Sequence, residues 1–269
     1  MKLSEWAKSA KTKISSLDAD LIAMHALGFT DRADLVLHAE DEYDYKEADE
    51  LLKKRMSGVP MAYILGYREF YGRKFEINPN VLIPRPETEQ MIISTLGIVD
   101  VEKINNITIV DVGTGSGCIP ITLKLELNKM NVWSDIVGVD VSVPALDLAQ
   151  ENADNMGAEV RFFCSNLLAS IPELPDIITA NLPYVDIRWN WTSEELKFEP
   201  ALALFTDDGG LKLIKKLIDQ IVEKIDNNKK KRFLLLEADT SQHNAIIEYA
   251  KERSFELLSQ DGFILTFRY

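Results

Sequence analysis

The sequence predicts an α/β protein, in which a three-layer sandwich with a mostly parallel sheet follows a small helical bundle and a β-hairpin linker. Three observations favour this fold. From residue 87 onward, short apolar segments alternate with longer amphipathic ones, as strands and helices do in α/β domains. The first 57 residues carry apolar side chains at helical spacing. Phe70–Ile77 has two strand-like pieces on either side of Gly72, which indicates a hairpin.

The N-terminal part, residues 1–59, is expected to be a helical domain that docks the substrate. Asp18 and Asp31 precede apolar stretches and are the expected N-caps, and Gly28 and Gly58 are the expected ends of two helices. A strongly acidic run within this part is either solvated surface or a surface that faces a partner.

Residues 60–86 form the expected linker, and residues 87–269 the α/β domain. Apolar strands imply a sheet that helices cover on both faces. Asp261-Gly262 is the expected turn of a closing antiparallel pair. The expected helices span 87–97, 117–128, 144–156, 209–226 and 241–252, and the expected strands span 107–111, 135–140, 159–164, 176–180, 232–237, 254–259 and 263–268.

Composition limits the classes of function. The formal net charge of -13 argues against extended binding along a nucleic-acid backbone, which needs many cationic contacts. No segment approaches the ~18 apolar residues of a membrane span. Cys118 and Cys164 make neither a disulfide framework nor a zinc site, so we expect no metal centre. Because the first residues also lack the apolar stretch of a signal peptide, we expect a cytoplasmic protein.

A glycine-rich turn follows the first strand of the α/β domain. Such a turn lets a ligand approach the backbone closely, but NAD enzymes use a similar one. Its pattern is Gly-x-Gly-x-Gly and not Gly-x-Gly-x-x-Gly, and S-adenosylmethionine (SAM) has no pyrophosphate for the loop to wrap, so the pattern favours SAM over NAD. The expected cofactor-binding residues here are Asp111, Gly113, Thr114, Gly115, Ser116 and Gly117.

The ends of the next two strands complete the expected cofactor site. Asp140 ends the second strand and can accept hydrogen bonds from both ribose hydroxyls; its alternative role is to cap the helix that begins near Pro144. Asp111 is expected either to hold the loop through its amides or to lie near the methionine ammonium group. Asn166 could bind the adenine edge and Leu167 its face, and an ordinary turn asparagine is the alternative.

A second buried strand ends in Asn181-Leu182-Pro183-Tyr184. An amide nitrogen is a poor nucleophile because its lone pair is delocalised into the carbonyl group. The Asn181 side-chain oxygen and the Leu182 carbonyl group can accept its N–H bonds and align it with a methyl donor. Tyr184 would pack against the planar group. We therefore expect methyl transfer from SAM to a planar nitrogen, with Asn181 touching both cofactor and acceptor, and an ordinary loop as the alternative.

Several segments resemble one known family. Asn181–Tyr184 is similar to the Asn-Pro-Pro-Tyr motif of amino methyltransferases that act on planar nitrogens. Leu82–Glu89, Phe198–Leu204 and Ala62–Gly66 resemble segments of the release factor glutamine methyltransferases of the HemK/PrmC type. The resemblance covers nearly the whole chain. It implies a class I (Rossmann-like) methyltransferase fold, with SAM as the cofactor.

The resemblance also implies a reaction and a substrate site. The reaction would be N5-methylation of the glutamine side chain in the Gly-Gly-Gln loop of peptide chain release factors. Asn181, Leu182, Pro183 and Tyr184 would form the catalytic and substrate-binding loop. Arg85 and Glu87, in the first of the similar segments, would bind the substrate together with this loop.

The sequence departs from the family pattern at three places. Leu182 replaces a proline, but the needed atom there is a main-chain carbonyl oxygen, and Pro183 still restricts ψ of residue 182. Asn166 stands where aspartate is usual and Leu167 where an aromatic residue is common. Ala238 stands within Glu237-Ala238-Asp239, where Glu-x-Gly is usual.

Two other functions compete with this reading. An N6-adenine RNA or DNA methyltransferase poses the same chemical problem and could use the same loop on a flipped base. The net charge and the lack of a target-recognition domain count against it. A non-catalytic SAM-binding scaffold is the second, and the intact Asn181 and Tyr184 speak against it.

Overall fold

The structure is a computed structural model, which describes residues 1–186, 188–189, 194–225 and 230–269. The chain forms two compact units. One contains Met1–Tyr67 and the short segment that ends at Phe198. The other begins at Arg68 and contains the rest of the chain.

The first unit is helical, as the spacing of its apolar residues predicts. Trp6 is the centre of its core: its ring stacks on Tyr45 at 5.4 Å between centroids, and its Nε1 donates to Asp49 Oδ1 at 2.9 Å. Segment 194–198 joins this unit through Glu195, whose Oε1 accepts from Arg55 Nη1. The helices are α1 (Leu3–Ala10), α2 (Ser16–Leu27), α3 (Arg32–Leu37), α4 (Lys46–Met56) and α5 (Met61–Leu65), with the short 3-10 helix η2 (Glu194–Phe198).

The helix ends of this unit confirm some expected caps and correct others. Asp31 is the N-cap of α3, and Gly28 ends α2 in the left-handed conformation. The cap of α2 is not Asp18 but Ser15, whose hydroxyl oxygen accepts from Asp18 N. The Asp18 carboxylate instead accepts from Arg55 Nε at 2.8 Å. Local spacing alone did not distinguish two polar residues within one turn.

The expected hairpin comprises β1 (Tyr67–Phe70) and β2 (Arg73–Glu76), joined by a two-residue turn. Both turn residues have positive φ, as a type I′ turn requires. Phe70 and Phe75 are fully buried and meet edge to face. Asn152 of the α/β domain binds both backbone groups of Glu76, which fixes the hairpin's outgoing strand against that domain.

The second unit is a three-layer α/β sandwich around a seven-stranded sheet of order β10-β11-β9-β6-β3-β4-β5. Strands β5, β4, β3, β6 and β9 are parallel, and β11 is antiparallel to both of its neighbours. The strand order reverses between β3 and β6, and such a point opens a crevice at the carboxyl ends of the strands. The strands are β3 (Asn106–Val112), β4 (Trp133–Asp140), β5 (Arg161–Cys164), β6 (Ile177–Ala180), β9 (Phe233–Glu237), β10 (Glu256–Asp261) and β11 (Ile264–Arg268).

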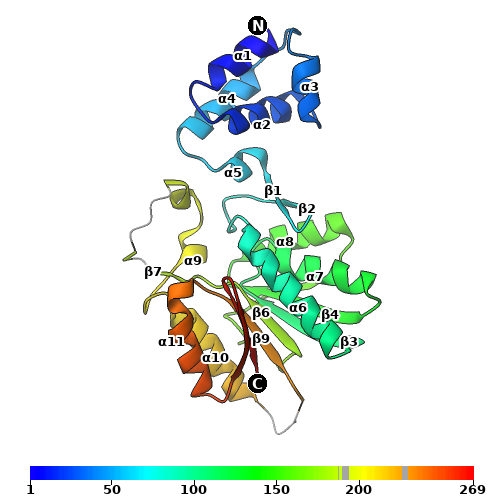
Figure 1. Cartoon of the computed structure of the whole chain (residues 1–269), viewed down its shortest axis with the longest axis vertical. Coiled ribbons are helices and arrows are strands. Elements are labelled where there is room, and N and C mark those ends of the chain that lie inside the picture. Colours follow the sequence, from blue (N-terminus) through cyan, green and yellow to red (C-terminus); the bar gives the residue numbers. More distant parts are fainter. Residues whose placement is uncertain (187, 190–193, 226–229) are drawn as a thin grey trace. The chain divides into compact units, whose positions relative to one another are not determined.

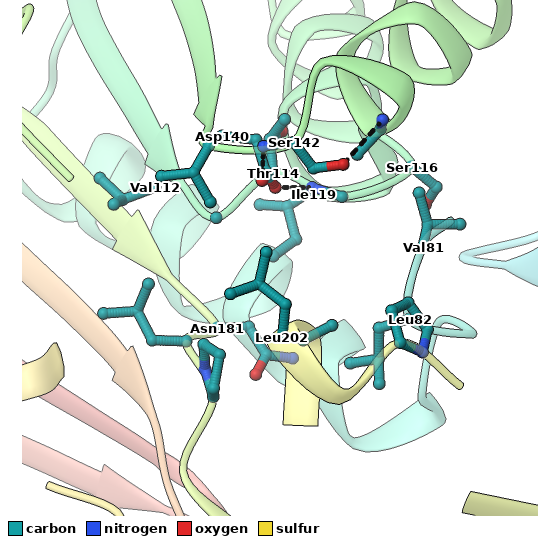
Figure 2. A pocket seen from close by; sticks show the side chains of 18 of the residues that line it. Val81, Leu82, Val112, Thr114, Ser116, Ile119, Asp140, Ser142, Asn181 and Leu202 are labelled. Atoms are coloured by element: carbon teal, nitrogen blue, oxygen red, sulfur yellow. Dashed lines mark hydrogen bonds between the residues drawn. The ribbon is translucent and has the colours of Figure 1, made fainter. Parts of the chain in front are cut away.

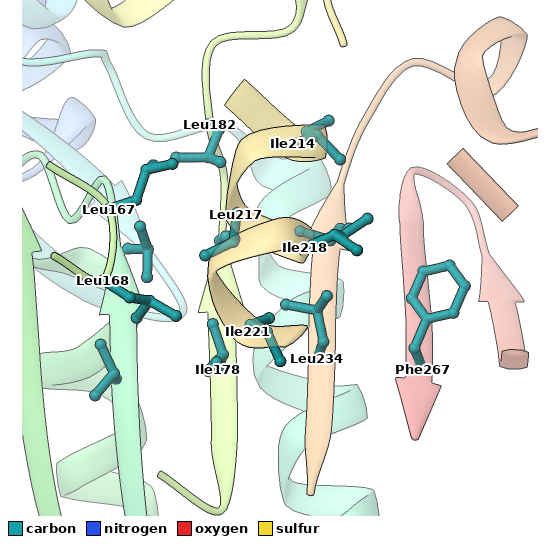
Figure 3. Close-up of a cluster of buried hydrophobic side chains, with 14 of the residues drawn as sticks. Leu167, Leu168, Ile178, Leu182, Ile214, Leu217, Ile218, Ile221, Leu234 and Phe267 are labelled. Atoms are coloured by element: carbon teal, nitrogen blue, oxygen red, sulfur yellow. The ribbon is translucent and has the colours of Figure 1, made fainter. Parts of the chain in front are cut away.

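Helices cover both faces of this sheet (Figure 1). On one face, Ile214, Leu217, Ile218 and Ile221 recur at helical spacing along α10 and are fully buried against the strands (Figure 3). Helix α10 (Lys212–Lys224) shares this face with α11 (His243–Lys251). The opposite face is covered by α6 (Glu89–Val101), α7 (Cys118–Lys129) and α8 (Val143–Met156).

Some short elements lay outside the sequence prediction. β7 (Val185–Asp186) and β8 (Phe205–Thr206) form a small parallel pair, and α9 (Ala201–Leu204) precedes β8. The closing hairpin turns at Gly262-Phe263, one residue after the expected position. Two- to four-residue elements carry too little periodicity to be seen in a sequence. The remaining short helices are η1 (Pro86–Thr88) and η3 (Thr240–Gln242).

Candidate cofactor and acceptor site

The glycine-rich turn joins β3 to α7, where the sequence placed it. The amides of Gly113 and Thr114 both donate to the carbonyl oxygen of Val139 on β4, at 2.8 and 3.0 Å. Gly113 and Gly117 have φ of 76° and 77°, which favours glycine. A Cβ on Gly117 would lie 2.9 Å from Ile121 Cδ1 and 3.1 Å from Ala149 Cβ. The glycines therefore permit both the turn and the close packing of α7 on α8.

Asp140 ends β4 and ties the turn to the next helix. Its Oδ2 accepts from the amide of Gly115 at 3.0 Å, and its Oδ1 accepts from the amide of Ser142 at 2.9 Å. The N-cap of α8 is Ser142, whose hydroxyl accepts from Ala145 N. The capping role considered for Asp140 thus belongs to Ser142. Each carboxylate oxygen keeps a lone pair for a ligand in the cavity that Asp140 lines.

Asp111 lies deeper than the other residues of the motif. It is fully buried, and its Oδ1 accepts from Thr179 Oγ1 on β6 at 2.7 Å. Burial raises the pKa of this carboxyl group to about 6, against the opposing effect of the nearby Thr179 and Thr114 hydroxyl groups. Its Oδ2 has no hydrogen-bond partner among the described residues. Asp111 does not line the cavity, and neither does Gly117.

The loop after β5 contributes one apolar and one polar residue to the cavity. Leu167 is buried and has a positive φ of 55°, and its side chain is shared between the cavity wall and the core. Asn166 is exposed, and its Oδ1 accepts from Lys216 Nζ at 3.0 Å. Its side-chain nitrogen remains available at the cavity edge.

The segment after β6 brings Asn181 and Leu182 beside the glycine turn. Asn181 Nδ2 donates to Thr88 Oγ1 at 3.2 Å, so its other end, Oδ1, is available to a ligand. Leu182 is buried in the core of the α/β domain, with its Cδ2 at 3.1 Å from the position of a Cβ on Gly113. Figure 2 shows Asn181 at the cavity opposite Thr114 and Asp140.

Tyr184 is held at both its hydroxyl group and its backbone. The hydroxyl donates to Glu237 Oε1 at 3.4 Å, and the carbonyl oxygen accepts from Gln242 Nε2 at 2.8 Å. A Cβ on Gly210 would lie 2.0 Å from that carbonyl oxygen, so Gly210 leaves room for the loop. Tyr184 does not line the cavity, whereas Pro183 does.

The two charged residues expected in the substrate site have different positions. Arg85 is half-buried, lines the cavity and forms an ion pair with Glu199, whose side chain is 1% exposed. Glu199 Oε2 also accepts from Ile83 N at 3.0 Å, so one buried carboxylate fixes both the linker backbone and the guanidinium group. Glu87 is exposed and does not line the cavity.

These elements enclose one cavity of about 310 Å³ at the carboxyl ends of β3, β4 and β6. Sequence reasoning missed two of its walls, although both belong to segments that resemble the family: one precedes α6 and the other is around α9. The lining residues that it did not assign are Asn80, Val81, Leu82, Pro84, Thr88, Val112, Cys118, Ile119, Val141, Ser142, Ala145, Ser165, Pro200, Leu202, Ala203 and Leu213.

The chemistry of the cavity suits SAM. A carboxylate lies at the end of β4 for hydroxyl groups, while Val141, Leu167 and Leu213 offer apolar walls for a purine ring. A Cβ on Gly115 would meet no atom within 4 Å, so the backbone of the turn is open to a ligand.

Among the described residues, no group of His, Cys, Asp or Glu is placed to hold a metal ion. Across the same residues, no helix is both long and apolar enough to cross a membrane.

Family models match two parts of the chain. The model described as the PrmC N-terminal domain matches residues 4–66, and the methyltransferase small domain matches residues 91–225. A release factor glutamine methyltransferase from Koribacter versatilis is 40% identical over 223 residues, which are 80% of this chain and 77% of that protein. One from Neisseria gonorrhoeae is 34% identical over 95% of this chain and 91% of its own length.

Solved structures show the same fold at low identity. The 16S rRNA N2 G1207 methyltransferase from Thermus thermophilus matches with a TM-score of 0.52 and 12% identity, over 75% of this chain and 48% of that one. The hMettl16 catalytic domain matches with a TM-score of 0.52 and 15% identity, over 82% and 81%. The class I methyltransferase fold that the sequence predicts is confirmed. The chain belongs to the release factor glutamine methyltransferase family, and it is an S-adenosylmethionine-dependent methyltransferase.

Proposed function

We propose that this enzyme methylates the side-chain nitrogen of the glutamine in the Gly-Gly-Gln loop of a peptide chain release factor. The observation that carries the proposal is the state of Asn181. Its amide nitrogen is occupied by Thr88, so its oxygen is the end that faces the cavity beside the glycine turn. An acceptor at that place selects a substrate with N–H bonds, such as a carboxamide. The names of relatives that share most of the chain support the same substrate.

We assign the cofactor contacts as follows. Asp140 accepts hydrogen bonds from the ribose hydroxyls, and the glycine turn approaches the cofactor through its backbone. Leu167 covers a face of the adenine ring, and the free side-chain nitrogen of Asn166 lies at its edge. Asp111 is buried behind the turn, and one of its oxygens has no hydrogen-bond partner among the described residues. Its negative charge attracts the methionine ammonium group of the cofactor. When bound, SAM supplies an electrophilic methyl group on its sulfonium.

The acceptor loop aligns the amide rather than deprotonating it. Asn181 Oδ1 and the Leu182 carbonyl oxygen accept the two N–H bonds of the glutamine, which orients its nitrogen and raises its electron density. Pro183 restricts ψ of residue 182 and so directs that carbonyl group. Tyr184 packs behind the loop and supports the planar group. Arg85, held by Glu199, provides a donor for a substrate carbonyl oxygen at the cavity.

The helical unit supplies the remaining part of the proposal. We propose that residues 1–59 dock the release factor, so that its Gly-Gly-Gln loop reaches the cavity. The cavity belongs to the α/β domain, residues 87–269, and residues 60–86 link this domain to the helices. The protein would act in the cytoplasm, where translation occurs, and the two unpaired cysteines are compatible with a reducing compartment.

The test is methyl transfer from labelled SAM to a purified release factor. The wild-type enzyme should label the factor and should not label the same factor with a Gln→Ala change in its Gly-Gly-Gln loop. Asn181→Ala should lower single-turnover transfer roughly 10²- to 10³-fold, because one preorganised polar group at the reacting centre is lost, and should leave SAM affinity nearly unchanged. An adenine-containing RNA and DNA serve as the comparison. Label in a nucleic acid but not in the factor would overturn the proposal.

A further inference from the structure

Glu237 is a buried carboxylate beside the acceptor loop with no role in the reaction described so far. It ends β9, which lies next to β6 in the sheet, and the residue is 1% exposed. Tyr184 donates to its Oε1 at 3.4 Å, and its Oε2 is buried without a hydrogen-bond partner among the described residues. Thr88 and Asn181 lie close enough to its carboxyl group to lower its pKa, although neither makes a hydrogen bond to it within the described part of the chain. A buried carboxylate oxygen without a hydrogen-bond partner lowers the stability of the folded protein, so the position of Glu237 beside the acceptor loop calls for an explanation.

Thr88 connects this carboxylate to the acceptor site. Thr88 is 2% exposed, and its Oγ1 accepts from Asn181 Nδ2. A threonine hydroxyl has one proton and two lone pairs, whereas an ionised glutamate only accepts. An ionised Glu237 attracts the Thr88 proton, and the lone pairs of Thr88 then face Asn181, as the hydrogen bond from Asn181 Nδ2 requires. The NH₂ end of Asn181 must then turn to Thr88 and its oxygen to the cavity.

We propose that Glu237 is a positioning residue, which acts through Thr88 and Tyr184 to fix the orientation of the Asn181 amide that receives the substrate. The role of that orientation in transfer rests on the proposed function. The long contact to Tyr184 is compatible with this role, because hydrogen bonds around an acceptor site often tighten only when the substrate is bound.

The protonation state of Glu237 should therefore control the loop. Burial raises the pKa of Glu237 to about 7, and nearby Glu87 adds to the rise, while the polar side chains of Thr88, Tyr184 and Asn181 oppose it. A protonated Glu237 becomes a donor and releases Thr88 to point the other way. The proposed orientation of the Asn181 amide is therefore present above the pKa of Glu237 and is lost as the pH falls through that value.

Other charged groups surround this network. Tyr184 faces Glu237 and is also within the fields of Arg85 and Asp239, and Cys118 of α7 is within the field of Glu237. Asp111, with a pKa raised to about 6, titrates on the neighbouring strand β3. A response that belongs to Asp111 would persist when Glu237 is replaced, which separates the two groups.

The first measurement needs no substrate. In the full chain labelled with ¹⁵N, the side-chain NH₂ resonances of Asn181 are identified by their loss in Asn181→Asp. They should shift with a midpoint near pH 7 in the wild type, and Glu237→Gln should remove that midpoint. Resonances that ignore both pH in this range and Glu237→Gln would overturn the proposal, whatever the substrate proves to be.

The second measurement is transfer at saturating SAM and release factor between pH 6 and 9. Glu237→Gln and Thr88→Val should each lower kcat roughly 10- to 100-fold, because the acceptor is misplaced, and the pair should be no worse than the worse single change. Thr88→Ser keeps the hydroxyl group and should restore kcat. The KM for SAM should stay within about twofold in each variant. If the two losses in kcat multiply in the double variant, Glu237 and Thr88 act on the acceptor loop independently, and the proposal is wrong.

Asp176→Asn is the matched control. Asp176 is also a buried carboxylate, but it immediately precedes β6, at the opposite end of that strand from Asn181, and its Oδ2 accepts from Thr108 N and Oγ1. Its replacement should change stability and leave the pH profile of kcat as in the wild type. If the wild type labels no release factor while the Asn181 resonances follow Glu237, the proposed function fails and the positioning role stands.

Discussion

At the scale of single residues, the site depends on side chains with more than one partner. Asp140 accepts from two amides that belong to different elements, the glycine turn and the start of α8. Its carboxylate therefore both shapes the turn and offers lone pairs to the cavity. Glu199 serves the backbone of Ile83 and the guanidinium of Arg85 in the same way. Such shared acceptors make the site rigid before any ligand arrives.

Asp140 gives the prediction at this scale. Asp140→Ala should weaken SAM binding by about 1.5–3 kcal/mol, because the ribose acceptor and the support of Gly115 are lost together. Calorimetry with SAM and with NAD measures this, and NAD should bind neither protein. Asp135→Ala is the control: Asp135 lies on the same strand but pairs with Arg161 on the surface, so its loss should not alter SAM affinity. SAM binding that is unchanged in Asp140→Ala would remove the ribose assignment.

At the scale of elements, the acceptor loop is braced from behind by segments far along the chain. Gln242 of η3 donates to the carbonyl oxygens of Tyr184 and Gly209, at 2.8 and 2.7 Å. Leu182 is packed into the core, so the apolar side chain that stands in place of the family's proline contributes burial and leaves its main-chain carbonyl group for the proposed substrate contact. The loop is thus fixed by its surroundings more than by its own sequence.

Two adjacent glycines test this bracing. Gly210→Ala would place a Cβ 2.0 Å from Tyr184 O and 2.2 Å from Gln242 Nε2, so the loop must move. Transfer should fall roughly 10²-fold, as a small misplacement of reacting groups allows, while SAM affinity should change little. Gly209 also has a positive φ, of 66°, but a Cβ there would meet only Asp186 Oδ2 at 4.0 Å.

Gly209→Ala therefore carries a similar backbone strain without the collision. It should retain most of the single-turnover rate of the wild type. If both variants transfer methyl equally well, the brace from Gly210 and Gln242 does not position the loop.

At the scale of the whole molecule, the chain consists of two compact units, to which we assign different tasks. The cavity lies in the unit that begins at Arg68, and so do Thr88, Asn181, Tyr184 and Glu237. The helical unit has its own core around Trp6, and its α3 exposes Val36 and Leu37, at 78% and 76%. Exposed apolar residues of this kind are compatible with the proposed docking of a protein substrate.

The prediction at this scale concerns a chain that begins at Arg68. It should bind SAM with an affinity within about twofold of the full chain. It should also methylate a short Gly-Gly-Gln peptide at a similar rate, because the truncation removes only substrate contacts that are remote from the reacting centre. Its KM for the intact release factor should rise more than about tenfold. An unchanged KM for the intact factor would show that the helical unit has no part in docking.

The sequence by itself determined the elements and the positions of the motifs. Apolar periodicity located the seven strands of the main sheet and the five longer helices around them, because burial of one face leaves a regular spacing in the chain. The glycine turn, Asp140 and the loop at Asn181 were also visible, because each follows directly from a strand whose carboxyl end lies at one edge of a parallel sheet.

Only the tertiary structure decided which residues act together. Thr88, Asn181 and Glu237 are far apart in the chain, and they meet because η1 and the ends of β6 and β9 converge. Periodicity reports that a side chain is buried but not what it is buried against. Local competition is equally hidden, since Ser142 and not Asp140 caps α8. Strand order and hydrogen-bond partners arise from packing the whole chain, and these set the chemistry of the site.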